Sequence, residues 1–305
     1  MLAKSMTMSA AESRTRLGSF ARDLLQLAKP RITGMVVFTF GAGLWLAPGA
    51  LGGGRALIAL FGTTLIVAGA NAINQYLERD VDGFMRRTSS RPLPEGRLLP
   101  GVALAFGGLM ASVSIPLMLV GGGFLMAALG LLAFYAYVWG YTPLKRRTPA
   151  ALYVGALPGA LPPLMGWVAV TGRMDVPGLA LFAILFLWQI PHFVAIATFR
   201  DEEYARAGFK VMALGRNPRF TRLTVVVSTA ALVAVTLALA PLGMAGWIYV
   251  ATAATLGVGF LTLAGRAFAV DPATPRARIW AKTLFLYSLL YLTALFVALG
   301  LDRSL

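Results

Sequence analysis

Cysteine is absent from the 305-residue sequence, and histidine occurs only once. Without cysteine the chain cannot form disulfides, zinc ribbons, cysteine-ligated iron–sulfur clusters or a catalytic thiol. A single histidine excludes any metal site that needs several. Charged residues make up only 13% of the chain, whereas 58% is hydrophobic and the mean hydropathy is +0.75. A surface that faces water on all sides needs more charge, so the composition predicts a membrane protein.

Long apolar runs, bounded by glycine, proline or charge, divide the chain into spans of about 20 residues, the length that crosses a bilayer as a helix. The runs are continuously apolar rather than alternating, which favours helices over a barrel. Three glycines at 121–123 separate two of the runs and predict a tight turn. We therefore expect an all-α polytopic protein with nine transmembrane helices. The predicted spans cover about residues 32–51, 56–77, 100–120, 123–141, 151–170, 177–199, 223–240, 243–264 and 283–300.

The net charge of +15 is concentrated on one side of these spans. If the N-terminus is cytoplasmic, 24 of the 27 Lys and Arg residues lie on the cytoplasmic side, and only Arg55, Arg173 and Arg303 lie on the other. The positive-inside rule then predicts a cytoplasmic N-terminus and a C-terminus on the opposite side. The charge is thus explained by topology and the lipid bilayer, and we expect no nucleic-acid partner. The short N-terminal tail favours a bacterial inner membrane.

Residues 1–28 are predicted to form a cytoplasmic tail, and residues 29–305 a single transmembrane domain. The tail contains acidic residues and lacks an apolar core, so it does not resemble a secretory signal. Its apolar residues recur at helical spacing, which suggests an interfacial helix on the inner leaflet; a disordered basic tail is the alternative. These apolar residues are Leu17, Phe20, Ala21, Leu24, Leu25 and Ala28.

A polar stripe continues from the second predicted span. Asn74, Glu78 and Asp82 are four residues apart, so on a helix they stay within about 80° of arc and about 12 Å of axis. Asp80 falls near the opposite face, and we give it a lesser role. Carboxylate and amide oxygens are hard ligands that suit Mg²⁺. The alternative is that the acids only pair with nearby arginines in a solvated loop, and for Glu95 we prefer that interpretation.

Basic residues lie just beyond these acids. Arg86, Arg87 and Arg91 follow Asp82 within nine residues, and Lys145 and Arg146 occupy the next cytoplasmic loop. Acids that bind a metal beside a cationic cluster suit a diphosphate, because the metal bridges its oxygens while Arg and Lys balance the remaining charge. Cytoplasmic loops are basic in any case, so only the proximity to the acids favours a binding role.

The sixth predicted span ends in a second acidic group, Asp201, Glu202 and Glu203. Two such helix ends facing each other could hold Mg²⁺ around one diphosphate, with Asp201 and Glu202 completing the metal set. His192 lies within the same span, with Trp188 one turn earlier. A lone histidine beside aromatics is commonly a packed core residue, but a neutral imidazole could also ligate haem iron or hydrogen-bond to a substrate.

These residues together resemble the UbiA-type intramembrane prenyltransferases over about residues 29–300. The stretch 74–82 is similar to the first aspartate-rich motif of that family, and Pro191-His192-Phe193 resembles the branch that farnesylates haem. Glu78 stands where the family usually has Asp, and the second motif lacks the regular pair of aspartates. Further similar stretches are Lys29-Pro30-Arg31, Tyr141-Thr142 with Lys145-Arg146-Arg147-Thr148-Pro149, and Gly159-Ala160-Leu161-Pro162-Pro163 with Gly166-Trp167.

The resemblance implies helices around a central cavity, farnesyl diphosphate bound through Mg²⁺ at the cytoplasmic end, and haem b as the acceptor. It further implies a place in haem O and haem A synthesis, with a haem A synthase or oxidase assembly proteins as partners. His192 and Trp188 would contact haem, and Pro162, Trp167 and Phe193 would form cavity walls. The alternatives are a family member that prenylates an aromatic quinone precursor, a transporter of an anionic substrate, and a nonenzymatic haem-handling subunit.

Overall fold

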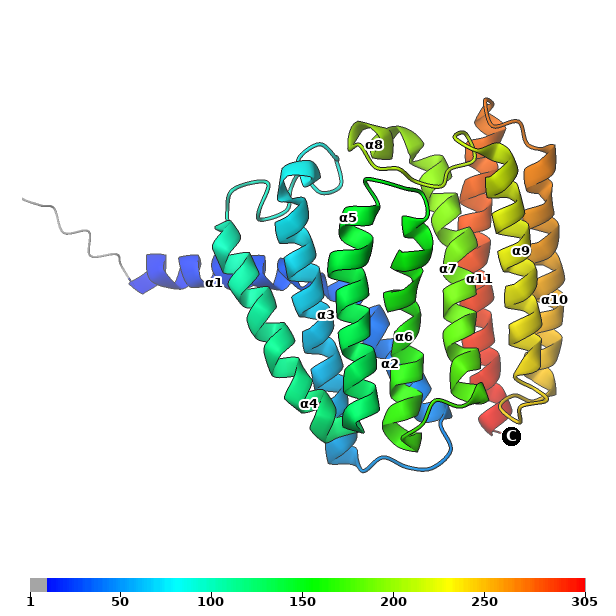
Figure 1. Ribbon diagram of the computed structural model, residues 1–305, viewed down its shortest axis with the longest axis horizontal. Coiled ribbons are helices and arrows are strands. Elements are labelled where there is room, and N and C mark those ends of the chain that lie inside the picture. The colour runs from blue at the N-terminus through cyan, green and yellow to red at the C-terminus, as the bar shows by residue number, and fades with distance from the viewer. Residues whose placement is uncertain (1–9, 305) are drawn as a thin grey trace, which may run out of the picture.

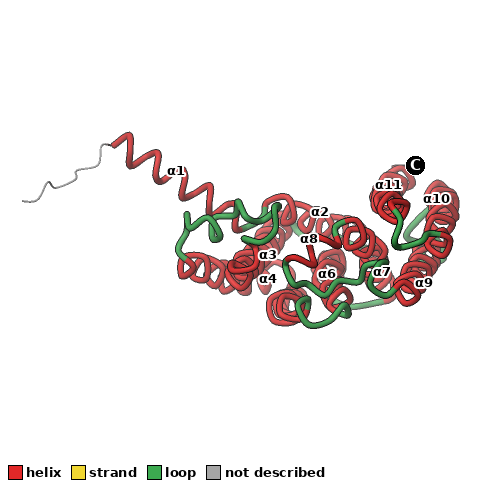
Figure 2. Tube along the Cα trace, turned by 90° about the horizontal axis from the view of Figure 1, so that it is seen from above, coloured by secondary structure: helices red, strands yellow, loops and turns green. Residues whose placement is uncertain are grey.

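The computed structural model describes residues 10–304, and every regular element within that range is helical. The long helices stand side by side, except for α1, which projects away from the others, and the short α8 lies across one end of them (Figures 1 and 2). The elements are α1 (Ala10–Leu27), α2 (Pro30–Leu46), α3 (Gly53–Asp82), α4 (Pro100–Tyr135), the π-helical η1 (Ala136–Tyr141), α5 (Thr142–Leu144), α6 (Ala151–Thr171), α7 (Val176–Phe199), α8 (Asp201–Arg206), α9 (Pro218–Ala238), α10 (Trp247–Gly265), the 3₁₀ turn η2 (Arg266–Ala269) and α11 (Pro275–Ser304).

Within the described range, seven helical segments are long and apolar enough to cross a membrane. The all-α polytopic fold is therefore confirmed, but the predicted number of nine spans is not. Helix α2 has only 17 residues, and the two spans predicted at 100–120 and 123–141 lie in one continuous segment, Pro100–Leu144. The number nine stays a prediction.

That continuous segment reverses at Gly123, where φ is +85° and ψ is 179°. A side chain is strained at this φ, so glycine suits the turn. Met118 and Gly130, on either side of the reversal, lie so close that a Cβ on Gly130 would be 2.7 Å from the Met118 sulfur. The two arms of the segment thus run antiparallel, as Figure 1 shows for the chain between the labels α4 and α5. The predicted tight turn at 121–123 is present.

Helices α2 and α6 pack at very short range. A Cβ on Gly43 would overlap the carbonyl of Pro163, and one on Gly166 would overlap the carbonyl of Phe40. Small residues allow backbones to approach this closely in a membrane, where van der Waals packing replaces the hydrophobic effect between helices. This contact holds α2, and therefore Lys29 at its start, in a defined position.

Side-chain amides of α3 form hydrogen bonds to the backbone at the junction between α1 and α2. Gln75 Nε2 donates to the carbonyl of Leu27 at 2.8 Å, and Asn71 Nδ2 donates to that of Ala28 at 3.3 Å. The next residue, Lys29, has the left-handed backbone φ of 48°, which turns the chain from α1 into α2. Residues 10–27 are helical, as the amphipathic pattern suggested. The interfacial position stays a prediction, and residues 1–9 of the proposed tail lie outside the described residues.

Helices α9 and α11 pack against α7 at one end of the molecule, and α10 packs against both of them (Figure 2). Asp302 near the end of α11 accepts hydrogen bonds from three backbone N–H groups at the start of α10. The donors are Gly246 at 2.7 Å, Tyr249 at 3.0 Å and Ile248 at 3.2 Å. This carboxylate caps α10 from a neighbouring helix and ties the two helices together.

Candidate active site

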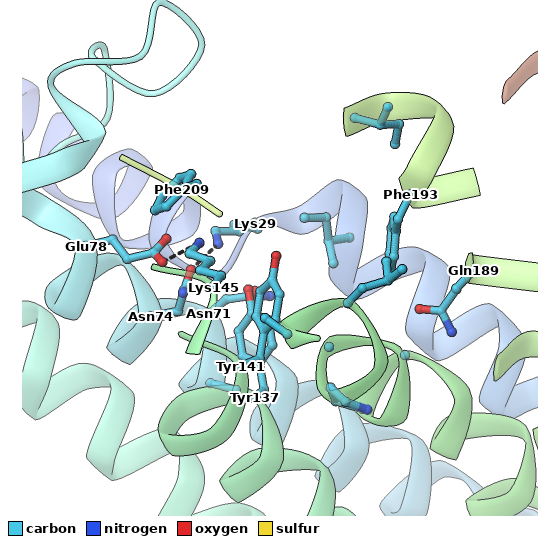
Figure 3. Close-up of a pocket in the computed structure, with 18 of the residues that line it drawn as sticks. Lys29, Asn71, Asn74, Glu78, Tyr137, Tyr141, Lys145, Gln189, Phe193 and Phe209 are labelled. Carbon is cyan, nitrogen blue, oxygen red and sulfur yellow. Dashed lines mark hydrogen bonds and ion pairs between the residues drawn. The ribbon is translucent and has the colours of Figure 1, made fainter. Parts of the chain in front are cut away.

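A cavity of about 430 Å³ opens among the C-terminal ends of α3 and α7, the η1–α5 segment and the chain that follows α8 (Figure 3). Its size falls in the range of small-molecule sites. One part of its wall carries charged groups and the rest is largely apolar. The charged and amide groups that line it are Lys29, Asn71, Asn74, Glu78, Asp82, Arg87, Arg91, Lys145, Gln189 and Lys210.

The polar stripe predicted on α3 lines this cavity. Asn74, Glu78 and Asp82 are all buried, with 2%, 3% and 1% of their surface exposed. Asp80 lies exposed on the other side of the helix beside Arg79, as its spacing predicted. Since α3 continues as a helix to Asp82, the four-residue spacing brings these three side chains into one line.

Each member of the stripe contacts a cation. Asn74 Oδ1 accepts from Lys29 Nζ at 2.8 Å, and Glu78 forms an ion pair with Lys145. Asp82 Oδ2 accepts from Arg91 Nη1 at 2.6 Å, whereas the buried Asp82 Oδ1 receives no hydrogen bond from any described residue. A buried carboxylate oxygen without a donor is costly, unless it coordinates a cation.

Lys29 was not among the site residues expected from the sequence, although its stretch contributed to the family resemblance. Burial first, and then the positive charge of Arg91, lower the pKa of Lys29 from 10.5 to about 7. The lowered pKa thus reflects mainly the burial of the ammonium, and to a lesser degree the nearby positive charge. A bound anion would favour the charged form of Lys29.

Lys145 reaches the cavity from the short loop after α5. Its Nζ lies 4.5 Å from the Phe209 ring centroid and 5.2 Å from that of Tyr141, which are cation–π distances. The carbonyl of Lys145 accepts from the N–H of Lys210 at 2.8 Å, so the chain after α8 is held against the same loop. The ammonium is thereby placed between Glu78 and two aromatic faces.

The predicted basic cluster is only partly assembled. Arg87, Arg91 and Lys145 line the cavity, as predicted. Arg86 and Arg146 are exposed and do not line it. Their assignment to the diphosphate therefore has no support from the geometry.

The second acidic group does not join the first. Asp201 Oδ1 accepts from Arg216 Nε at 2.6 Å, Glu203 pairs with Arg200 at 3.2 Å, and Glu202 is exposed. None of the three lines the cavity, and the described residues contain no group of three His, Cys, Asp or Glu side chains that could hold a metal. The structure does not bring Asp201 and Glu202 to the cavity beside Glu78 and Asp82, and their predicted role in holding a metal stays a prediction.

The physical reason is that this chain segment faces the site with its apolar side. Ala207 and Phe209 are buried against Met85 just beyond α3, with Tyr204 beside them. Burying these side chains turns the acidic residues of α8 toward solvent and their arginine partners. Tyr204 and Phe209 line the cavity in place of the acids.

The apolar part of the cavity is formed by aromatic rings and by α6 and α7. The Tyr137 and Tyr141 rings stack with centroids 5.8 Å apart, and Phe193 and Gln189 lie on the far side of them from Glu78 (Figure 3). Phe193 is the predicted wall residue that does line the cavity; Pro162 and Trp167 are buried elsewhere in α6. Gln189 also lines the cavity and was not predicted. Its position as the amide within an otherwise apolar run was the sequence signal that could have indicated it.

His192 and Trp188 pack between α7 and α11. His192 Nδ1 lies 2.8 Å from Ser288 Oγ, and the Trp188 Nε1–H donates to the Ser288 carbonyl at 2.6 Å. The two rings stack with centroids 4.6 Å apart, and neither residue lines the cavity. Their predicted contact with haem stays a hypothesis that this geometry does not support.

Taken together, the fold and the cavity define a multi-pass membrane protein with a cavity lined by basic and acidic side chains at one end of its helices. The model of the UbiA prenyltransferase family matches residues 35–298, and the chain belongs to this family. It is 50% identical to the protoheme IX farnesyltransferase of Myxococcus xanthus, over 94% of this chain and 96% of that protein. It is 47% identical to the protoheme IX farnesyltransferase of Anaeromyxobacter dehalogenans, over 98% of this chain and all of that protein.

Solved structures share the fold at low sequence identity. A digeranylgeranylglyceryl phosphate synthase superposes with a TM-score of 0.79 and 15% identity, covering 92% of this chain and 98% of that one. A UbiA homologue from Archaeoglobus fulgidus, solved with GPP and Mg²⁺, superposes with a TM-score of 0.64 and 16% identity, covering 91% of this chain and 99% of that one.

Proposed function

We propose that this prenyltransferase moves the farnesyl group of farnesyl diphosphate to a vinyl group of protohaem IX (haem b), giving haem O and diphosphate. The observation that carries the proposal is the likeness to protoheme IX farnesyltransferases at up to 50% identity over nearly the whole chain. The cavity agrees with it, because a cationic wall suits diphosphate and an apolar wall suits a prenyl chain and a porphyrin.

We propose Mg²⁺ as the cofactor, held by Asn74, Glu78 and Asp82 together with oxygens of the diphosphate. The buried Asp82 oxygen without a donor fits this role, and so does a donor set made only of oxygens. When bound, the metal supplies Lewis-acid stabilisation of negative charge on the leaving group. The Archaeoglobus fulgidus homologue solved with Mg²⁺ and GPP supports the assignment by analogy.

The side chains of this protein would contribute in three ways. Lys29, Arg91 and Lys145 lie where they can balance the charge that develops on departing diphosphate. The faces of Tyr137 and Tyr141 can stabilise the allylic cation, as aromatic rings do for cations. The apolar wall excludes bulk water, which would otherwise capture the farnesyl cation before the vinyl group attacks it.

The topology proposed with this function places the N-terminus and the site on the cytoplasmic side of a bacterial inner membrane and the C-terminus on the other. The charge distribution supports this orientation, since 24 of the 27 Lys and Arg residues then lie on the cytoplasmic side. A haem A synthase or oxidase assembly protein would then take up the product.

The test is incubation of the purified protein with haem b, farnesyl diphosphate and Mg²⁺, followed by mass analysis of the porphyrin. We expect a farnesylated porphyrin and released diphosphate. Asp82→Asn should reduce turnover at least about a hundredfold, whereas Asp80→Asn, two residues away on the exposed face, should leave it unchanged. Transfer to a hydroxylated aromatic acid, and not to haem, would favour the quinone-precursor alternative. A titration of His192→Ala with haem tests the remaining hypothesis about that histidine.

A further inference from the structure

Gln189 is a buried amide in the part of the cavity that lies away from the charged wall. It is 6% exposed, and it is the only polar residue among the four α7 residues that line the cavity. Figure 3 shows it across the two tyrosine rings from Glu78. A buried amide in an apolar wall needs an explanation, because each of its polar atoms requires a partner.

The hydrogen bonds of Gln189 use only one side of its amide. Nε2 donates to the Leu185 carbonyl at 3.0 Å and to the Ala156 carbonyl at 3.2 Å, which occupies both of its hydrogens. Oε1 accepts no hydrogen bond from the described residues. A Cβ on Gly159, another cavity-lining residue, would overlap Oε1, so this oxygen packs directly on the Gly159 backbone and needs a glycine there.

The chemistry of Oε1 restricts what it can bind. A carboxamide oxygen only accepts hydrogen bonds, and the donors of this amide are already committed. Haem b offers no donor here, because its pyrrole nitrogens bind iron and its ionised propionates are themselves acceptors. Farnesyl diphosphate has no donor along its prenyl chain. Water is therefore the reactant that suits this oxygen.

We propose that Gln189 positions the water molecule that completes the reaction, an inference that rests on the proposed function. The vinyl group attacks C1 of the farnesyl chain, a C–C bond forms, and the C–O bond electrons leave with diphosphate. Positive charge then lies on the vinyl carbon next to the ring. Water held by Gln189 Oε1 adds to this carbon, and its extra proton passes to the released diphosphate, leaving a hydroxyethylfarnesyl group. Without a positioned water, the same cation loses a proton from the neighbouring carbon and becomes an alkene.

The test measures the ratio of alkene to hydroxylated product, which mass analysis separates by one water. Gln189→Met keeps the size of the side chain and removes the acceptor. Gly159→Ala keeps the amide but pushes a methyl group toward Oε1 from the facing helix. We expect both variants to raise the alkene ratio about fivefold, the factor that one hydrogen bond is worth. Leu185→Met is the control, because Leu185 is buried one turn away in α7 and does not line the cavity.

An unchanged product ratio in Gln189→Met and Gly159→Ala, with farnesyl transfer still measurable, would overturn the role of Gln189. The same ratio shift in Leu185→Met would also overturn it, because the effect would then come from repacking of α7. Failure of the wild-type protein to farnesylate haem would instead remove the proposed function, and this inference with it.

Discussion

The ion pair between Glu78 and Lys145 provides the most direct test of how the site is built. The two side chains are in contact, with 4% and 14% of their surface exposed. Removing one partner leaves the other as an uncompensated buried charge, which costs about 3 kcal/mol, at the lower end for buried pairs because Lys145 retains some solvent. At about 2 °C per kcal/mol for a chain of this length, we expect Glu78→Gln or Lys145→Met to lower Tm by about 6 °C.

The double variant distinguishes the pair from two independent effects. Because both charges are gone, Glu78→Gln/Lys145→Met should recover about 2 kcal/mol relative to the sum of the single variants. Activity should not recover, since the proposed reaction uses both groups. The assays are thermal unfolding in detergent without substrate, and porphyrin mass analysis for turnover. Additive Tm losses, with a coupling energy below about 0.5 kcal/mol, would refute the pairing. Restored turnover in the double variant would refute the proposed roles.

Three further predictions concern other contacts. Arg91→Met should raise KM for farnesyl diphosphate at least about tenfold in steady-state kinetics, whereas exposed Arg86→Met should change it less than about twofold. Gln75→Leu should raise the same KM about fivefold, because the α1–α2 junction that orients Lys29 loses a hydrogen bond; equal KM values would show that the junction holds without it. Asp302→Ala should destabilise the protein by about 1–2 kcal/mol in thermal unfolding and leave kcat unchanged, since the carboxylate caps α10 away from the cavity.

Helical periodicity accounts for the part of the site that could be predicted. Asn74, Glu78 and Asp82 could be assigned to one face because α3 is a regular helix through Asp82. The all-α polytopic architecture and the reversal near Gly123 followed from apolar runs and glycine in the same way. Periodicity is a local property, so these predictions needed no knowledge of how distant segments pack.

The predicted site residues that the structure places away from the cavity, and the one that the sequence did not reveal, depend on packing between distant segments. The acids at 201–203 resemble a second metal motif in the sequence, but burial of Phe209 against Met85 turns them away from the cavity. His192 faces Ser288 on α11, a partner that is 96 residues away. Lys29 enters the site through a left-handed backbone turn between two helices, and no periodic pattern shows such a turn.

The uneven distribution of the lining residues along the chain has a consequence for biosynthesis. Among the described residues, every one that lines the cavity lies between Lys29 and Met212, and α9, α10 and α11 contribute none. During synthesis, all of these cavity-lining residues therefore leave the ribosome before the last three helices are made. Helix α7, which carries one wall, packs against α9 and α11. We therefore expect a stop codon in α10 to abolish activity through loss of the helices that pack against α7, although it would remove none of the described residues that line the cavity.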